Sequence, residues 1–269
     1  MNKNKLEIGL LSRIKKFINN IELSQEQKTK IQKSHQYLRK NYLNKLDYVS
    51  NTFLTGSYKK STLINHSNND VDMFVVLNGY NQYNIKPDTV LDKLKKDLKS
   101  KYTTTEIKQN KPCIVLNFRH ITFELTPVIK IDNTLQLALG LENIPEFYMP
   151  NLSSNNEWVK IDNPRILEKE LSIANKKFDN QLVPLIKMMK KCKLHNNISN
   201  IQSFEIEKLA IDNLNYINNY RNGIEQLLKI YGWTHPNYTY EEIENFTDIC
   251  FAKFCRDSLF GNDFPMVKG

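Results

Sequence analysis

Two aspartates separated by one residue stand at the start of an apolar segment. Asp70 and Asp72 open the sequence Asp-Val-Asp-Met-Phe-Val-Val, which predicts a strand over 71–77 that is buried on both faces. Side chains at i and i+2 of a strand share a face, roughly 6–7 Å apart along the chain. Two such carboxylates repel each other and lose solvation unless a cation lies between them. The pair therefore fits a hard divalent cation such as Mg²⁺, which takes oxygen ligands and usually bridges to substrate phosphates.

A glutamate in a later strand is a candidate third ligand. Glu124 lies in Phe-Glu-Leu-Thr-Pro, flanked by apolar residues, within a strand expected over 122–131. It either faces solvent on an edge strand or joins the two aspartates. Three convergent carboxylates can hold two metal ions about 3.5–4 Å apart, the arrangement used for in-line attack at phosphorus. One ion then lowers the pKa of an attacking hydroxyl, and the other neutralises the departing pyrophosphate.

A Gly-Ser pair precedes the aspartates in the sequence. Gly56 allows the backbone to approach a ligand closely, and Ser57 offers an N–H and a hydroxyl to a phosphate oxygen. An Asp-x-Asp pair alone is usually a surface or turn feature. Its combination with the Gly-Ser pair and Glu124 favours a phosphate-handling site.

The elements that must position these residues form a mixed first part and a helical second part. Strands are expected over 48–55, 71–77, 103–108, 113–118 and 122–131, with a helix over 88–101 and a loop over 132–164. Helices are expected over 165–177, 182–194, 204–217, 222–231 and 240–254. We therefore predict a first domain over 1–150 and a helical domain over 151–269.

Positive charge is concentrated at the N-terminus. Residues 1–45 hold 11 basic and 3 acidic residues, a net charge of +8 out of +9 for the chain. Leu6, Leu10, Ile14 and Ile18 predict a helix there, and Ser24 with Gln27 resembles a capping box that restarts it. This helical region is either a cationic spine that attracts nucleic acid or a lysine face in solvent. No aromatic residues are interleaved on the basic face, which favours the second interpretation.

Composition excludes several classes of protein. With 269 residues, 40% of them hydrophobic, and 13 Phe and 13 Tyr, the chain is not a disordered tail. No apolar run is long enough to span a membrane and no signal-peptide core is present, so we expect a cytoplasmic protein without a membrane partner. The four cysteines lack the spacing of zinc sites and are expected to be reduced packing residues: Cys113, Cys192, Cys250 and Cys255.

In combination, these motifs resemble the polymerase-β-like nucleotidyltransferase superfamily. The sequences Gly-Ser-Tyr-Lys-Lys-Ser-Thr, Asn-Asp-Val-Asp-Met-Phe-Val-Val and Phe-Glu-Leu-Thr-Pro are similar to those of its bacterial CD-NTase branch. Members of that branch are relatives of cyclic GMP-AMP synthase and oligoadenylate synthase that act in CBASS anti-phage defence. The resemblance implies an α+β fold: a nucleotidyltransferase core with a mixed sheet and helices, a C-terminal oligoadenylate-synthase-like helical lobe, and an active site in the cleft between them.

The helical half extends this resemblance. Lys187 and Lys190 match the family helix whose lysine reaches the triphosphate, and they share one helical face; the alternative is that they are solvated surface lysines. Ser203 and Phe204 match a segment in which the serine contacts phosphate and the aromatic ring stacks on the base; the alternative for Phe204 is a core position. One departure is Cys192, which stands where family members often carry Trp.

The resemblance implies a metal-dependent nucleotidyltransferase. It would join ribonucleoside triphosphates (ATP, GTP, UTP or CTP) into a cyclic or short linear oligonucleotide messenger for a downstream effector, releasing pyrophosphate. Asp70, Asp72 and Glu124 would hold two Mg²⁺ or Mn²⁺ ions, and Glu124 would deprotonate or orient the attacking hydroxyl. Many relatives have Asp in place of Glu124, and the chain is short for the branch, so the base preference stays open.

Two other functions remain as alternatives. The first is nucleotide addition to an RNA 3′ end, as in CCA-adding or poly(A) enzymes, with the basic N-terminal region gripping RNA. The second is a non-catalytic nucleotide- or RNA-binding module. The acids, the Gly-Ser pair and the lysine helix occur together, which favours an enzyme. We do not expect nucleic acid to be an obligate activator.

Overall fold

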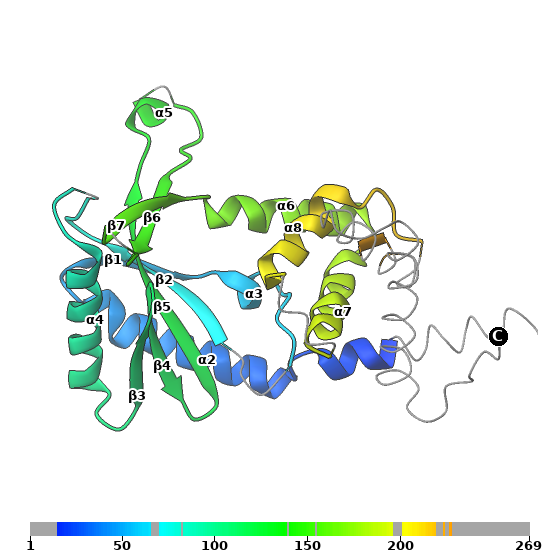
Figure 1. Ribbon diagram of the computed structural model, residues 1–269, viewed down its shortest axis with the longest axis horizontal. Coiled ribbons are helices and arrows are strands. Elements are labelled where there is room, and N and C mark those ends of the chain that lie inside the picture. Colours follow the sequence, from blue (N-terminus) through cyan, green and yellow to red (C-terminus); the bar gives the residue numbers. More distant parts are fainter. Residues whose placement is uncertain are drawn as a thin grey trace, which may run out of the picture. The chain divides into compact units, whose positions relative to one another are not determined.

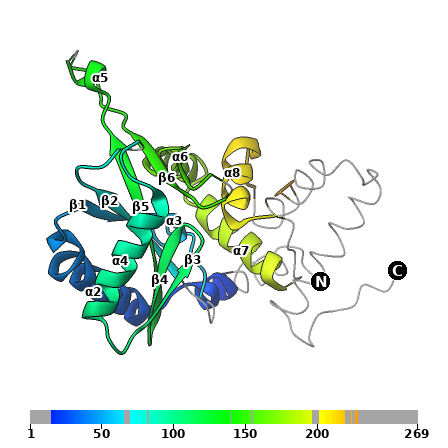
Figure 2. The ribbon, with the colours of Figure 1, turned by 60° about the vertical axis from the view of Figure 1, so that its left-hand side comes forward.

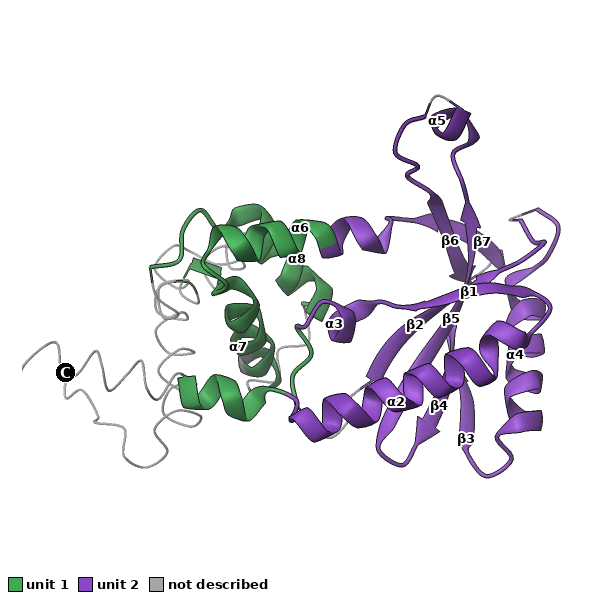
Figure 3. Cartoon of the chain, turned by 180° about the vertical axis from the view of Figure 1, so that it is seen from behind, with its two compact units in different colours: residues 1–22, 62–66, 169–269 green, residues 23–61, 67–168 purple. Residues whose placement is uncertain are grey.

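The computed structural model divides the chain into two compact units, coloured separately in Figure 3. It describes residues 15–65, 70–81, 83–138, 140–153, 155–195, 201–218, 223 and 226–227. Unit 1 comprises residues 1–22, 62–66 and 169–269, and unit 2 comprises residues 23–61 and 67–168. This division differs from the boundary predicted at residue 150, since unit 1 consists of three separate segments of the chain. The helices expected over 222–231 and 240–254, and the start of the helix expected from Leu6, lie almost entirely outside the described residues.

Unit 2 is built on a mixed sheet of seven strands (Figure 1). Five strands follow the order β1-β2-β5-β4-β3, and β5 also pairs with β6, which pairs with β7. Among these described strands, β2 and β5 pair in parallel and every other pairing is antiparallel. The strands are β1 (Val49–Leu54), β2 (Asp70–Leu77), β3 (Glu106–Asn110), β4 (Cys113–Phe118), β5 (Ile121–Ile131), β6 (Glu146–Asn151) and β7 (Glu157–Ile161). The mixed sheet and the α+β class are thus confirmed, and the cleft between lobes stays a prediction.

Two helices pack against this sheet (Figures 1 and 3). Helix α2 (Gln25–Asn41) begins with the predicted capping box, in which Ser24 and Gln27 bond each other's backbone N–H groups. Helix α4 (Pro87–Lys101) begins with a proline and buries one apolar side, formed by Val90, Leu91, Leu94 and Leu98. The Tyr48 hydroxyl donates a hydrogen bond of 2.7 Å to Asp97 of α4, which ties this helix to the residue that precedes β1.

The expectation of a loop over 132–164 is wrong. This stretch contains helix α5 (Thr134–Ala138) and strands β6 and β7. Helix α5 lies on an arm that stands away from the sheet (Figures 1 and 2). No residue of α5 is buried, and Leu135 and Leu137 are exposed. Strand β3 begins three residues later than expected, because Thr103–Thr105 form a turn after α4.

Unit 1 is helical in its described part. Its helices are residues 15–21, α6 (Pro164–Lys177, from residue 169 onward), α7 (Leu182–His195) and α8 (Ser203–Asn213). The helices expected over 165–177 and 182–194 are confirmed, whereas the one expected over 204–217 ends at Asn213. Their shared core includes Phe17, Leu185, Ile186 and Ile64, the last from the segment 62–65. None of the helices in the described ranges has an apolar stretch long enough to cross a membrane.

Candidate active site

The parallel pairing of β2 with β5 brings the predicted acids together. Asp72 is the register partner of Glu124, and Asp70 is the partner of Thr122, two positions earlier. The alternate residues Val71 and Phe123 are fully buried, so the carboxylates share the opposite face of the sheet. The structure thus places Glu124 beside the aspartates, and its role as a third ligand stays a prediction. The edge-strand alternative is wrong, because β5 lies between β2 and β4.

The electrostatics of this face centre on Glu124. Burial is the largest cause that raises the pKa of its carboxyl to about 6, and the neighbouring charges of Asp70 and Asp72 raise it further. A hydrogen bond from the Cys113 thiol acts in the opposite direction. The three carboxylates thus repel one another, and this repulsion is the signature of a site that favours positive charge.

The thiol beside Glu124 is a feature that sequence reasoning missed. Cys113 is free and buried at the start of β4, and the antiparallel register of β4 with β5 places it on the acid face. Burial, followed by the charges of Glu124, Asp72 and Asp70, raises the pKa of this thiol to about 12. It therefore stays protonated at neutral pH, and it donates a hydrogen bond of 3.2 Å to the Asn110 carbonyl. Only the strand register, which no sequence spacing reveals, could have identified it.

The Gly-Ser pair begins a short helix, α3 (Gly56–Lys59), directly after β1. Gly56 has φ +65°, and a Cβ atom placed on it would lie 1.8 Å from Oδ2 of Asp72. The Thr55 N–H also donates a hydrogen bond of 3.0 Å to the Asp72 carbonyl. The Asp72 carboxylate therefore packs directly on the Gly56 backbone, and only glycine fits there. Ser57 follows it and is half-buried.

The donor set on this face fits a hard divalent cation. Its members are carboxylate oxygens, which Mg²⁺ and Mn²⁺ prefer, and their mutual repulsion is relieved by bound positive charge. As it stands, no group of three or more His, Cys, Asp or Glu side chains within the described residues is arranged to hold a metal ion. The carboxylates therefore have the donor atoms of a metal site, although their arrangement does not form a complete set of ligands.

The two predicted phosphate-binding lysines are buried within unit 1. The Lys187 ammonium lies 2.6 Å from Oε1 of Glu22, and the Lys190 ammonium lies 2.6 Å from Oε1 of Glu207. Their side chains are 8% and 6% exposed, so the alternative of solvated surface lysines is wrong. Phosphate binding by either lysine stays a prediction, and it would compete with these ion pairs.

The predicted base-stacking segment lies at the start of α8. Ser203 is exposed in the first turn, and the Phe204 side chain is 57% exposed. The alternative of a core aromatic is therefore wrong. An exposed ring at a helix start is available to stack on a base. The nucleotide contacts of Ser203 and Phe204 stay predictions.

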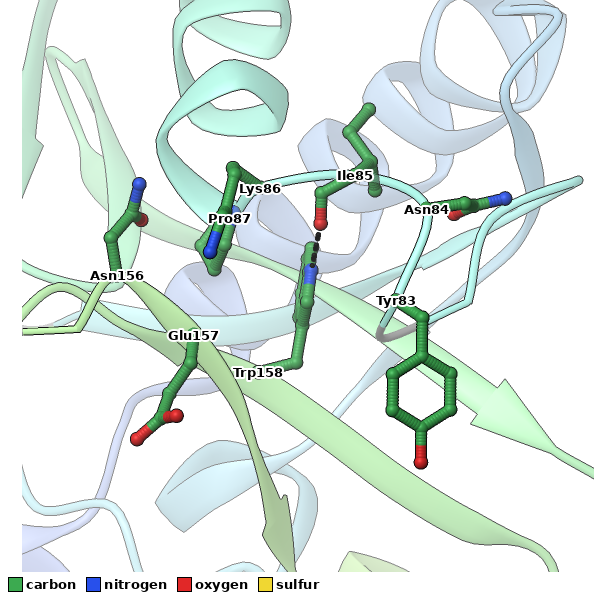
Figure 4. A pocket seen from close by; sticks show the side chains of 8 residues that line it. All are labelled: Tyr83, Asn84, Ile85, Lys86, Pro87, Asn156, Glu157 and Trp158. Carbon is green, nitrogen blue, oxygen red and sulfur yellow. Dashed lines mark hydrogen bonds between the residues drawn. The ribbon is translucent and has the colours of Figure 1, made fainter.

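A small surface hollow in unit 2 contains none of the predicted site residues. It has a volume of about 180 Å³ and lies between the loop before α4 and strand β7 (Figure 4). The Trp158 indole N–H donates a hydrogen bond of 2.8 Å to the Ile85 carbonyl, drawn as a dashed line in Figure 4. Trp158 thus ties the β6–β7 hairpin to that loop, which is a structural role.

Comparison with solved structures finds the same fold in CD-NTase proteins of bacteria. CdnE c-UMP-AMP synthase of Rhodothermus marinus, with Apcpp and Upnpp, has a TM-score of 0.64 at 13% identity and covers 96% of this chain and 97% of its own. CdnG of Bradyrhizobium diazoefficiens in complex with GTP has a TM-score of 0.63 at 9% identity and covers 92% and 94%. CdnE cyclic dinucleotide synthase of Elizabethkingia meningoseptica has a TM-score of 0.61 at 18% identity and covers 87% and 88%. These likenesses show the fold. No curated protein matches the chain.

The family is shown by the sequence itself. Residues 9–170, more than half of the chain, match the model of the Second Messenger Oligonucleotide or Dinucleotide Synthetase domain. The matched segment contains Gly56, Ser57 and all three carboxylates of the acid face. With the motif, the fold and the family model in agreement, this chain belongs to the second messenger oligonucleotide or dinucleotide synthetases, the CD-NTase family of nucleotidyltransferases.

Proposed function

We propose that this protein joins ribonucleoside triphosphates into a cyclic or short linear oligonucleotide and releases pyrophosphate. The observation that carries the proposal is the register of β2 with β5, which pairs Asp72 with Glu124 and keeps Asp70 on the same face. The similar structures contain GTP, or Apcpp with Upnpp, and the Rhodothermus protein makes c-UMP-AMP. These relatives support nucleoside triphosphates as the substrate class.

The reaction is the attack of a ribose hydroxyl on the α-phosphorus of a second triphosphate. The new P–O bond forms as the bond from the α-phosphorus to the pyrophosphate oxygen breaks. Glu124, with a pKa of about 6, is mainly ionised at neutral pH and accepts the hydroxyl proton. The Cys113 thiol, which stays protonated, lies beside Glu124 and lowers the pKa of its carboxyl.

Asp70, Asp72 and Glu124 are the residues that would hold divalent cations here. When bound, Mg²⁺ or Mn²⁺ supplies positive charge that acidifies the attacking hydroxyl and stabilises the departing pyrophosphate. The close packing of Asp72 on Gly56 restricts where that carboxylate can lie. Ser57 is assigned to the phosphates through its N–H and hydroxyl, and Phe204 to stacking on a base.

The test is to incubate the full chain with all four labelled triphosphates and Mg²⁺ or Mn²⁺, and to identify the product by mass spectrometry. We expect a small nuclease-resistant oligonucleotide, and no pyrophosphate release from the Asp70→Ala/Asp72→Ala variant. The matched control is Asp92→Ala/Asp212→Ala, which removes two exposed carboxylates and should keep full turnover. Unchanged turnover in the Asp70→Ala/Asp72→Ala variant would overturn the assignment of this site.

A parallel reaction containing RNA distinguishes oligonucleotide synthesis from the main alternative, nucleotide addition to an RNA 3′ end. Labelled RNA that lengthens by single nucleotides would instead assign 3′-terminal addition, and nucleotide binding without turnover would assign a binding module. We expect neither, and we expect duplex RNA or DNA to leave turnover unchanged. The proposed anti-phage role rests on family membership. It is tested by comparing phage plating on cells that carry the wild-type or the Asp70→Ala/Asp72→Ala chain together with its neighbouring genes.

A further inference from the structure

The segment between β5 and β6 exposes apolar side chains at a distance from the sheet. We call residues 132–145 the arm; it contains α5 and stands away from the rest of unit 2 (Figures 1 and 2). Burial of leucine and isoleucine is favourable, so several of them exposed on one short segment mark an interaction surface. Four side chains of the arm are between 48% and 68% exposed: Leu135, Leu137, Leu141 and Ile144.

The polar side chains of the arm hold its two halves together. The Asn133 backbone N–H donates a hydrogen bond of 3.0 Å to the side chain of Asn143. The Asn143 amide donates in turn to Asp132 at 2.6 Å. The side chain of Gln136 accepts a hydrogen bond of 3.0 Å from the Ile144 N–H. The exposed apolar surface is therefore preformed, which lowers the entropic cost of binding a partner.

The charge of the arm limits the kind of partner that it fits. Residues 132–145 contain Asp132 and Glu142 and no lysine or arginine, in a chain whose net charge is +9. Both acidic residues are exposed. They disfavour an anionic membrane surface and nucleic acid, which are themselves negatively charged. The complementary surface therefore combines apolar contact with positive charge.

Helix α2 carries such a surface. Lys33, Tyr37 and Lys40 follow one another at spacings of four and three residues, so they lie on one side of the helix. We call these three residues the α2 face; all of them are exposed, Tyr37 by 54%. The expectation of a basic face without aromatic residues is therefore wrong for α2. The tyrosine ring and the lysine stems offer apolar contact, and the ammonium groups complement the acids of the arm.

The arm and the α2 face of one chain lie apart. Both belong to unit 2, and α2 lies on the side of this unit away from α5 (Figures 1 and 3). A contact between the two surfaces therefore joins different copies of the chain. Because the surfaces differ, each copy offers one arm and one α2 face. Contacts of this head-to-tail type close into rings or extend into filaments.

We propose that the arm of one copy docks on the α2 face of a second copy, so that the protein assembles head to tail. This inference is independent of the proposed function, since no residue of the acid face takes part in the contact.

Sedimentation velocity of the full chain, from low to high micromolar concentration, measures the assembly. We expect the sedimentation coefficient of the wild type to rise with concentration. The arm variant Leu135→Ser/Leu137→Ser should associate at least about 30-fold more weakly, as for loss of central apolar contacts. The α2 variant Lys33→Glu/Lys40→Glu should associate at least about 10-fold more weakly, because like charges would then face each other.

A mixture of these two variants provides the decisive measurement. The arm variant keeps its α2 face and the α2 variant keeps its arm, so together they should form a one-to-one complex that grows no further. The matched controls are Ile166→Ser and Lys96→Glu/Lys99→Glu, which change exposed side chains elsewhere in unit 2. Both controls should assemble like the wild type.

Three results would overturn the proposal. The first is a wild-type chain that stays monomeric at high concentration. The second is assembly that the arm variant loses and the α2 variant keeps, which would assign a contact between two arms. The third is an α2 variant that assembles like the wild type but loses binding to duplex RNA or DNA, which would assign the α2 face to nucleic acid.

Discussion

Two carboxylates of unit 1 and the three on the acid face of unit 2 differ in the charge of their neighbours. In unit 1, Glu22 and Glu207 each have a lysine ammonium at 2.6 Å. In unit 2, the acid face brings carboxylates together, and their mutual repulsion helps to raise the pKa of Glu124 to about 6. Charges neutralised by the chain itself stabilise the fold, whereas charges left in repulsion serve a ligand that brings positive charge. The predictions below test this contrast, beginning with the largest expected effect.

Removing a carboxylate that is paired with a buried lysine should lower the free energy of unfolding strongly. We expect Glu207→Ala to lower the free energy of unfolding by about 3–5 kcal/mol, because it breaks the buried ion pair between Glu207 and Lys190. Urea denaturation measures this loss. Asp212→Ala, an exposed acid on the same helix, is the control and should change stability by less than about 0.5 kcal/mol. Equal effects of the two substitutions would contradict the contrast.

Gly56→Ala should disturb the acid face directly. We expect a loss of about 1–3 kcal/mol from the positive φ, plus a further cost from the clash with the Asp72 carboxylate. Gly79→Ala is a matched control, because its φ is +75° and nothing lies within 4 Å of its added Cβ. The clash is measured by how much more Gly56→Ala lowers the free energy of unfolding than Gly79→Ala does. That excess should shrink in an Asp72→Ala background, and a persistent excess would mean that another contact is responsible.

Neutralising Glu124 on the acid face should raise the free energy of unfolding, in contrast to the two preceding substitutions. The pKa of Glu124 is about 6 when folded and 4.5 as the reference value, so between these pH values the folded state binds more protons than the unfolded state. Stability without metal therefore falls as pH rises from 4.5 through 6. We expect wild type to lose about 1 kcal/mol relative to Glu124→Gln over this range, allowing for solvent screening. A flat difference between the two stability curves would refute the repulsion.

Cation binding provides the complementary measurement. At pH 7, adding Mg²⁺ or Mn²⁺ to wild type should raise the melting temperature, since binding to the folded state alone stabilises it. EDTA should reverse the effect. Glu124→Gln should respond less, and Asp70→Ala/Asp72→Ala should not respond at all. An equal shift in all three proteins would place the cation elsewhere.

The smallest effect is expected from the thiol that supports Glu124. Cys113→Ala removes a hydrogen bond that lowers the Glu124 pKa, so that pKa should rise by less than about 1 unit. The pH range over which stability falls with rising pH should then extend to higher values. Cys113→Ser keeps a donor and should resemble wild type. A shift to lower pH in Cys113→Ala would contradict the assigned hydrogen bond.

The strands that carry the acids could be predicted because their sequence pattern is local. Runs of β-branched and apolar residues predicted β2 and β5 closely and β4 at its observed bounds, Cys113–Phe118. The Asp-x-Asp spacing predicted the shared face of the aspartates, and the apolar strand pattern around Glu124 made it the candidate third acid. The hairpin of β6 and β7 was missed because Pro150 lies within β6, and proline argues against a strand.

The partners of the lysines could not be predicted, because they are set by tertiary packing. Glu22 lies 165 residues from Lys187, and Thr62, whose hydroxyl accepts a hydrogen bond from Lys190, lies 128 residues from that lysine. Helical spacing alone allows both lysines to face either solvent or a phosphate. The outward position of Phe204 was likewise undetermined, since an aromatic residue at a helix start fits a core or a surface equally well.

The parallel pairing of β2 with β5 also has a consequence for biosynthesis. Asp72 and Glu124 are 52 residues apart in the sequence, and parallel neighbours cannot be joined by a tight hairpin. A ribosome adds about 5–20 residues per second, so on the order of 3–10 s separates the emergence of these two carboxylates. A truncated product that ends before the later strand therefore has the two aspartates but lacks the third carboxylate of the acid face.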